Sequence, residues 1–336
     1  LSRGPYFAVS VAHANEALNG LCVMEAKRSA SVLSFTRFKI QAESVVMSPE
    51  RAAKIIGMYS RGVLAVFDIE TKRKIIEQKI AAPLVYWTWA GTQFMLLVTS
   101  AHVFQWLIPM NPGESPSPPA KLFDRGDIDK SDPQQWAQRR VLQAQRSSDD
   151  QWAFVLSSER HRPEHAVDQA ELLRTSKVCV HHVATNTVHI MNAIAAGFTM
   201  IDGNLALVVV HSSDSSASHR VSMHMLHDPS ILASSDAWQA TEQWTVALPL
   251  ASEESSTGVS AGAWVWFPHE NHVAIVTYRG FMHLLNSSDG QEEQPAKALA
   301  SEYLLDSSLH EDSETGKKTI LAVGRQSGSV YSMEMQ

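Results

Sequence analysis

Short apolar runs separated by polar breaks recur along the whole chain. Within residues 43–80 three such runs follow one another, at Ile55–Tyr59, Val63–Ile69 and Ile75–Ile80. The runs are rich in β-branched residues, and the breaks between them are short enough for tight turns. This pattern predicts a meander of antiparallel strands, and we expect its surface to be the working part of the protein.

The same pattern predicts strands on both sides of this stretch. They are expected at Tyr6–Val11, Leu21–Met24, Ser31–Phe38, Leu84–Ala90, Phe94–Thr99, Val103–Pro109, Ala120–Phe123, Arg140–Ala144, Trp152–Leu156, Val178–Val183, Val188–Ile194, Gly197–Ile201, Leu205–Val210, Val221–Leu226, Trp244–Leu248, Gly262–Phe267, Val273–Tyr278, Phe281–Leu285, Ala298–Leu305, Thr319–Val323 and Ser329–Met333. Helical periodicity is weak, and only Ala166–Arg174 is expected to form a short helix. The meanders amount to about seven units of ~45 residues, as in β-propeller blades. We therefore predict an all-β fold, a seven-bladed β-propeller, with residues 1–336 as a single domain.

Composition limits the function more than the fold. Of the 336 residues 44% are hydrophobic and 19% charged, which is typical of a globular domain with a large core. The net charge of −7 gives no reason to expect nucleic acid as a partner. Cys22 and Cys179 lie in separate apolar runs, which indicates buried thiols in a reducing compartment. With neither a bilayer-spanning window nor a signal-peptide pattern, the sequence predicts a cytoplasmic protein.

Motifs that could carry chemistry are few. His161–His165 spells H-x-x-E-H, a zinc-peptidase pattern, but Pro163 interrupts the helix that this chemistry needs, so a loop is expected. His181 and His182 would point to opposite faces of a strand and are expected to be ordinary sheet residues. The tryptophans in apolar runs are expected to pack between blades. We therefore predict no catalytic residues, no metal and no cofactor.

The cations Lys72, Arg73 and Lys74 follow an apolar strand pair in this acidic chain. Lysines often protect exposed strand edges, so on their own they favour binding no more than edge protection. An acidic, apolar peptide would suit such a border.

Together these motifs resemble one known family, the N-terminal propeller domain of the clathrin heavy chain, of which this chain looks like a divergent member. The residues that carry the resemblance occur in the family's order, at Ala42–Ser44, Met47–Pro49, Val66–Lys72, Tyr86–Trp89, Leu97–Thr99, Phe104–Trp106, Ala120–Arg125, Ser148–Trp152, Phe198–Met200, Gly203–Asn204, Thr277–Leu284 and Val323–Val330. The resemblance implies a non-enzymatic coat-protein domain that docks short acidic-hydrophobic peptides of adaptor proteins in inter-blade grooves, at the cytoplasmic face of clathrin-coated pits and vesicles. It implies contact with the membrane only through adaptors. Clathrin light chain and other heavy chains would bind parts of the full-length chain outside these residues, which include no helical leg.

The resemblance also implies particular peptide-binding residues. The family's main groove falls here on Ile40, Ile56, Val63, Ala65, Phe67, Lys72 and Lys74. The isoleucines and Phe67 would form apolar pockets, and the lysines would meet an acidic residue of the peptide. Val63 and Ala65 replace side chains that form hydrogen bonds in the family, so the groove is expected to bind more through apolar burial.

Two secondary grooves map onto the chain as well. One involves Trp152 and Val180, with Thr185 in the place of a basic residue, and a central pocket involves Phe7 and Leu142. The alternative interpretation is a propeller of the same architecture that has lost recognition of such peptides and makes other coat or sorting contacts.

Overall fold

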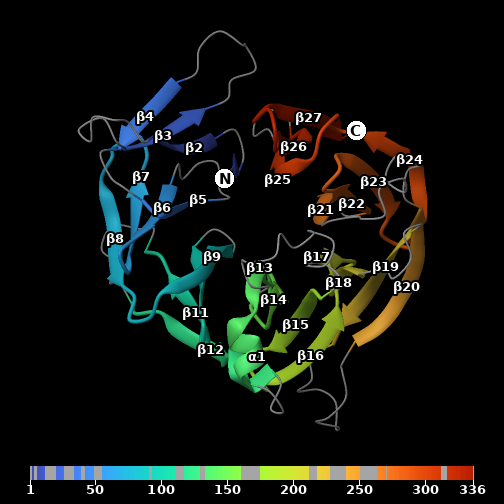
Figure 1. The fold of residues 1–336 in the computed structure, drawn as a ribbon. Coiled ribbons are helices and arrows are strands. Elements are labelled where there is room, and N and C mark those ends of the chain that lie inside the picture. The colour runs from blue at the N-terminus through green and yellow to red at the C-terminus, as the bar shows by residue number, and fades with distance from the viewer. Residues whose placement is uncertain are drawn as a thin grey trace.

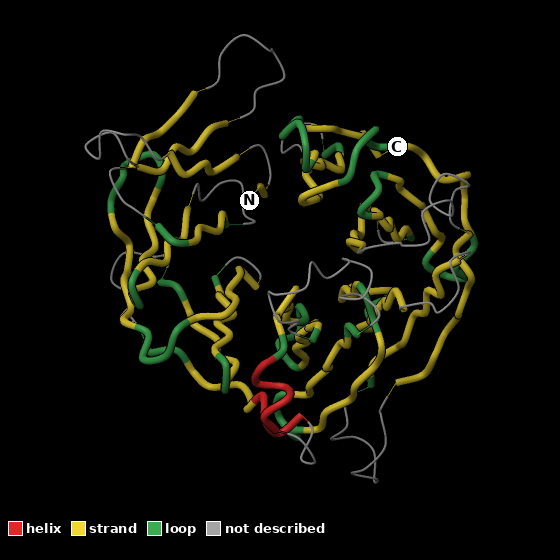
Figure 2. Tube along the Cα trace, viewed as in Figure 1, coloured by secondary structure: helices red, strands yellow, loops and turns green. Residues whose placement is uncertain are grey.

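The computed structural model describes most of the chain in short antiparallel strands. The described residues are 2–3, 6–11, 20–25, 34–38, 42–48, 55–90, 93–109, 117–128, 133–159, 175–211, 218–227, 240–249, 263–269, 271–311 and 316–335. For residues 2–38 only the backbone is described. Strands make up most of the described trace, and helix is confined to one connection (Figure 2). The prediction of an all-β fold is therefore confirmed.

The strands form six sheets of four strands and one sheet of three, and each sheet is a meander of strands consecutive in the chain. The first four sheets comprise β1 (Ser2–Arg3), β2 (Tyr6–Val11), β3 (Gly20–Glu25) and β4 (Ser34–Phe38); β5 (Ser44–Met47), β6 (Ile55–Ser60), β7 (Val63–Asp68) and β8 (Lys74–Lys79); β9 (Leu84–Ala90), β10 (Phe94–Thr99), β11 (His102–Leu107) and β12 (Ala120–Asp124); and β13 (Arg140–Arg146), β14 (Trp152–Ser158), β15 (Lys177–His182) and β16 (Thr187–Asn192).

The remaining sheets comprise β17 (Ala195–Ile201), β18 (Asn204–His211), β19 (Ser218–Leu226) and β20 (Ala240–Pro249); β21 (Ala263–His269), β22 (His272–Thr277), β23 (Phe281–Asn286) and β24 (Glu292–Ala298); and β25 (Leu304–Glu311), β26 (Lys318–Gly324) and β27 (Val330–Met335). A 3-10 helix, η2 (Arg125–Ile128), and the helix α1 (Pro133–Gln138) connect the third sheet to the fourth.

The sheets are arranged around a common centre in chain order (Figure 1). The first strand of each sheet lies innermost and contacts the first strand of the next sheet, from β1 and β5 through to β21 and β25. β25 also contacts β1, so the first and last sheets are neighbours.

The apolar core lies between neighbouring sheets. Separate clusters of buried side chains join the second sheet to the third, the third to the fourth and so on to the last sheet. In the second to sixth sheets the second strand is covered on both faces, so it has no polar face to alternate with. All seven residues of Trp152–Ser158 are buried, for example. This explains the continuous apolar runs in the sequence.

Tryptophans join adjacent sheets, as the sequence predicts. The Trp87 indole N–H donates a hydrogen bond of 2.7 Å to Ser44 Oγ of the second sheet. The Trp244 indole N–H donates in the same way to the Ser287 carbonyl, at 2.8 Å. The second and third sheets also approach closely at Gly57, where an added Cβ would lie 2.7 Å from the Trp87 ring. The tryptophans thus combine apolar burial with a satisfied N–H group.

Some predicted elements differ from the structure. Ala298–Leu305 is not one strand, because β24 ends at Ala298 and β25 begins at Leu304. Strands β5 and β24 and helix α1 were not expected. The predicted helix Ala166–Arg174 and the motif His161–His165 lie outside the described residues. Of the two cysteines, Cys179 is fully buried, as expected, whereas the side chain of Cys22 is outside the described part.

Candidate functional site

The residues predicted to bind a peptide lie mainly on one face of the second sheet. Along β7 the side chains of Val63, Ala65 and Phe67 share a face, because successive residues of a strand alternate between faces. Leu64 and Val66 point to the other face and are fully buried against the third sheet. The face of Val63, Ala65 and Phe67 is only half-buried and is directed toward the first sheet (Figure 1). We call it the β7 face.

Three charged residues of β8 border the β7 face. Each is the strand partner of one of its apolar residues: Lys74 of Phe67, Glu77 of Ala65 and Lys79 of Val63. In a regular strand Lys74 and Glu77, three positions apart, would lie on opposite faces, but a β-bulge in this strand pair brings them to the same face. Lys74 Nζ lies 2.5 Å from Glu77 Oε2, and the side chains are 48% and 54% exposed.

Lys72 lies in the turn between β7 and β8. Its φ of 56° is in the left-handed region, which few residues other than glycine and asparagine adopt readily. Asp68 Oδ1 holds the turn by accepting hydrogen bonds from the N–H of Thr71 at 2.7 Å and from its hydroxyl at 2.9 Å. The turn therefore holds the backbone that carries the exposed Lys72 side chain, at the end of β7 where Phe67 lies.

The two isoleucines of the predicted site differ in what the structure describes. Ile56 is the strand partner of Phe67, has 0% of its surface exposed and packs in the cluster on which Phe67 lies. Ile56 thus packs beside Phe67 on the same face of the sheet, and Phe67 is the more accessible of the two. Ile40 lies outside the described residues.

The residues of the secondary grooves are mostly interior. Trp152 and Val180 are buried between the fourth and fifth sheets, and Leu142 packs against the same cluster. Thr185 is exposed, and its Oγ1 lies 2.8 Å from Nδ1 of His182, whose ring packs against Trp152. Phe7 lies in β2, of which only the backbone is described. The structure thus brings Trp152 and Thr185 together through His182.

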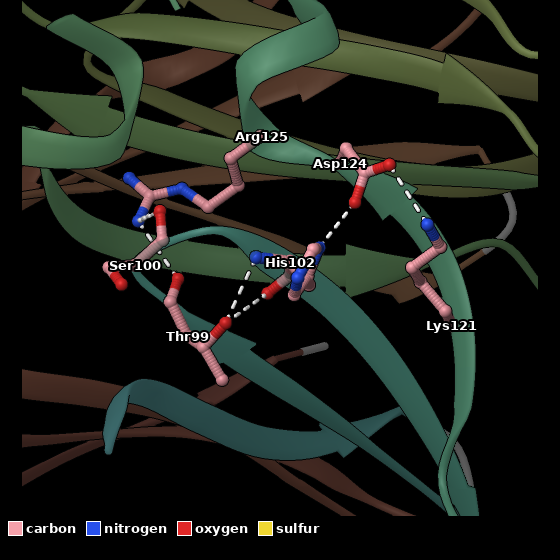
Figure 3. A network of polar contacts seen from close by, with 6 residues as sticks. All are labelled: Thr99, Ser100, His102, Lys121, Asp124 and Arg125. Carbon is pink, nitrogen blue, oxygen red and sulfur yellow. Dashed lines mark hydrogen bonds and ion pairs between the residues drawn. The ribbon is translucent and has the colours of Figure 1, made fainter. Parts of the chain in front are cut away.

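A polar network at the end of the third sheet contains a His–Asp pair, as some catalytic sites do. His102 Nδ1 contacts Asp124, whose other oxygen accepts a hydrogen bond of 2.9 Å from Lys121 (Figure 3). The hydrogen bond from Lys121 is the main cause that lowers the pKa of Asp124. The nearby hydroxyl of Thr99 bonds the backbone of His102 and not its ring. This network therefore ties strands β10, β11 and β12 together.

The described ranges contain no group of three or more His, Cys, Asp or Glu side chains that could hold a metal ion. His181 and His182 are both buried, and His181 stacks on Phe123 with ring centroids 4.2 Å apart. Their packing agrees with the expectation of ordinary sheet residues. Among the described residues there is no helix with the length and apolarity that crossing a bilayer requires.

Two charged residues of the border, Glu77 and Lys79, were not expected from the sequence. Alternation along β8 alone would place Glu77 on the face opposite Lys74, because a bulge leaves no clear mark in a sequence. In the sequence, the only indication is that Glu77 and Lys79 are two positions apart, so both would lie on one face of a strand.

Comparison with known proteins shows similarity to clathrin heavy chains over about a third of the chain. The probable clathrin heavy chain of Schizosaccharomyces pombe is 34% identical over 108 residues, which are 32% of this chain and 6% of that protein. Clathrin heavy chain of Drosophila melanogaster is 36% identical over 90 residues, 27% of this chain and 5% of that protein. The chain thus spans only a small part of the length of these relatives. No family model matches the chain.

Solved structures show the same fold at low identity. The β-propeller domain of Cps50 (Swd1) from Myceliophteria thermophila superposes with a TM-score of 0.58 at 9% identity, over 95% of this chain and 92% of that one. A chain of the mitotic checkpoint complex gives a TM-score of 0.57 at 10% identity, over 98% of this chain and 87% of that one. The solved structures confirm the predicted propeller architecture. The sequence relatives confirm the predicted resemblance to clathrin heavy chains.

Proposed function

We propose that the chain is the terminal propeller of a clathrin heavy chain and that its β7 face docks short acidic-hydrophobic peptides of adaptor proteins. The observation that supports this most is the half-buried apolar column of Val63, Ala65 and Phe67 with Lys72 and Lys74 at one end. Partly accessible apolar side chains beside cationic side chains suit a peptide with apolar residues followed by an acidic one. The domain is a binding module and not an enzyme.

An extended peptide presents alternate side chains to one surface, and the β7 face offers apolar positions with the same period of two residues. Burial would contribute roughly 25 cal/mol per Å² of apolar surface. Val63 and Ala65 offer no side-chain hydrogen bond to the peptide backbone, and a disordered peptide loses entropy when it binds. Each peptide is therefore weakly held, and many propellers on one coat provide avidity.

The proposed fold is a closed, seven-bladed propeller in which each sheet is a blade. The contacts between successive first strands, including β25 with β1, support closure. This places the β7 face between the first and second blades. The secondary positions Trp152, Val180, Thr185, Phe7 and Leu142 remain proposed sites, and Thr185 is the most exposed of the described ones.

The proposed place of action is the cytoplasmic face of clathrin-coated pits and vesicles. Adaptor peptides are the proposed partners of this domain, and light chains and other heavy chains would bind elsewhere in the full-length protein.

Titration of a fluorescent acidic-hydrophobic clathrin-box peptide tests the proposal. We expect saturable binding to the wild type and about tenfold weaker binding to the double variant Lys72→Asn, Lys74→Gln, because two border charges are removed. Asparagine suits the left-handed backbone at Lys72, so the turn is kept. Lys317→Gln, on the last sheet, is the matched control.

A second variant, Phe67→Ala, tests the apolar part of the site. It should weaken binding even at high salt, where the lysines contribute little. Equal binding by the wild type and both variants would place the peptide elsewhere, and Thr185 would be examined next. A wild type that fails to bind while remaining folded would contradict the proposed function.

A further inference from the structure

We propose that Glu77 is an internal anion that competes with the peptide for Lys74 and so sets the charge specificity of the β7 face. This inference rests on the proposed function. Glu77 lies opposite Ala65, in the middle of the apolar column, and its carboxylate is 2.5 Å from the Lys74 ammonium. An acidic peptide residue directed to Lys74 therefore either displaces Glu77 or shares the ammonium with it, and sharing places two carboxylates of like charge side by side.

The pair depends on the bulge in the β7–β8 ladder. Lys74 pairs with Phe67 and Ile76 pairs with Val66, so the bulge leaves Ile75 as an extra residue between them. This extra residue brings Lys74 to the face that holds Glu77. Both side chains are about half-exposed, so a peptide can reach them and solvent screens their attraction. Displacement is thus possible, and its cost is modest.

The distribution of charge along the border follows from this pair. Lys72 and Lys79 lie at opposite ends of the column, while Glu77 and Lys74 largely cancel between them. The face therefore favours a peptide whose acidic residues flank its apolar ones, and it disfavours an acidic residue placed over Ala65. Glu77 is then a specificity-determining residue that no motif in the sequence identifies.

Four proteins test this inference with one fluorescent acidic-hydrophobic peptide: the wild type, Glu77→Gln, Lys74→Gln and the double variant. An exposed ion pair is worth up to about 1 kcal/mol, so Glu77→Gln should tighten binding by about two- to fivefold. Lys74→Gln should weaken binding less in the wild type than in the Glu77→Gln background, where Lys74 is free to meet the peptide. The gain from Glu77→Gln should fall as salt is raised.

Glu334→Gln is the matched control. It removes the acid of another exposed pair, Lys317–Glu334, also 2.5 Å long, on the last sheet. It should leave peptide affinity unchanged. If the wild type binds and Glu77→Gln has no more effect than Glu334→Gln, the inference is wrong while the proposed function stands. If neither the wild type nor Glu77→Gln binds, the proposed function fails and the inference fails with it.

Discussion

Arg125 is a single charged residue that organises the connection between the third and fourth sheets. Its side chain is 1% exposed, and its guanidinium donates to the carbonyls of Thr99 at 3.0 Å, Trp136 at 2.7 Å and Arg139 at 3.0 Å. Burial lowers the pKa of Arg125 to about 10, so the group stays charged at neutral pH. The Trp136 carbonyl, at the end of helix α1, also accepts the Arg139 N–H at 3.3 Å, so Arg125 is its second and closer donor.

We predict that Arg125→Met destabilises the protein by about 2–4 kcal/mol, because several buried carbonyls lose their donor at once. The measurement is the urea midpoint and slope of unfolding, followed by tryptophan fluorescence. Arg140→Met is the control, since Arg140 is exposed and lies at the start of β13. An Arg125→Met protein as stable as this control would show that the carbonyls find other donors.

At the same scale, the candidate site was only partly predictable. Val63, Ala65 and Phe67 occupy alternate positions in the sequence, and they do share a face in the structure. The position of Glu77 depends on a bulge, which arises from how two strands pair and not from the residues of either strand alone. Long-range pairing therefore limits what the sequence can say about charge at this face.

At the scale of elements, strands β18 and β19 carry a buried chain of polar side chains. His211 Nε2 lies 2.6 Å from Ser222 Oγ, which in turn lies 2.8 Å from His224 Nε2. His211 Nδ1 lies 3.0 Å from the Asn192 carbonyl, and Arg220 is 3.3 Å from the same ring nitrogen. These hydrogen bonds form when both imidazole rings are neutral. His211 Nε2 then accepts from the Ser222 hydroxyl, and Ser222 Oγ accepts from the Nε2–H group of His224.

Burial, and then the charge of Arg220, lowers the pKa of His211 from 6.5 to about 4. Burial also lowers the pKa of His224 and of His189 on the neighbouring β16, while Glu242 acts in the opposite sense on His224. An unfolded chain binds protons on these residues at a higher pH than the folded one. The contribution of His211 to stability is therefore complete above pH ~6.5 and is lost as the pH falls toward its folded pKa of about 4, and His224 and His189 act in the same direction.

We predict that His211→Gln flattens this dependence, by up to about 1.4 kcal/mol per pH unit between the two pKa values. Glutamine keeps a hydrogen-bonding group but does not titrate. The free energy of unfolding in urea, measured at several pH values from 4 to 7, gives the slope. His227→Gln is the control, because His227 is exposed. A His211→Gln slope equal to that of the control would contradict the assignment.

Sequence reasoning located elements well where burial dictates composition. Strands such as β14 and β18, the second strands of their sheets, are buried on both faces, and their continuous apolar runs marked them, as at Asn204–His211. The strand β24 (Glu292–Ala298) lies outermost and is polar with a central proline, so its pattern resembles a loop. Helix α1 is only six residues long, and its Trp136 carbonyl accepts a hydrogen bond from Arg125, a contact that no local pattern indicates.

At the scale of the whole molecule, the arrangement makes each sheet depend on its two neighbours. From the second sheet to the last, five apolar clusters of described side chains each join two neighbouring sheets. The proposed closure of the ring would depend on the contact between the first and last sheets. This contact involves β1, a strand of two residues that contacts both β5 and β25.

We predict that deleting residues 1–3 loosens both sheets that flank this junction. Hydrogen exchange measured by mass spectrometry should show lost protection in β25 as well as in β2 and β5, because all three lose a backbone neighbour. Strand β14, on a distant sheet, is the internal control and should keep its protection. Loss confined to β2, with β25 unchanged, would mean that the first and last sheets do not support each other. Since the deletion removes the contacts of β1 with β2, β5 and β25, it should also lower the temperature of unfolding.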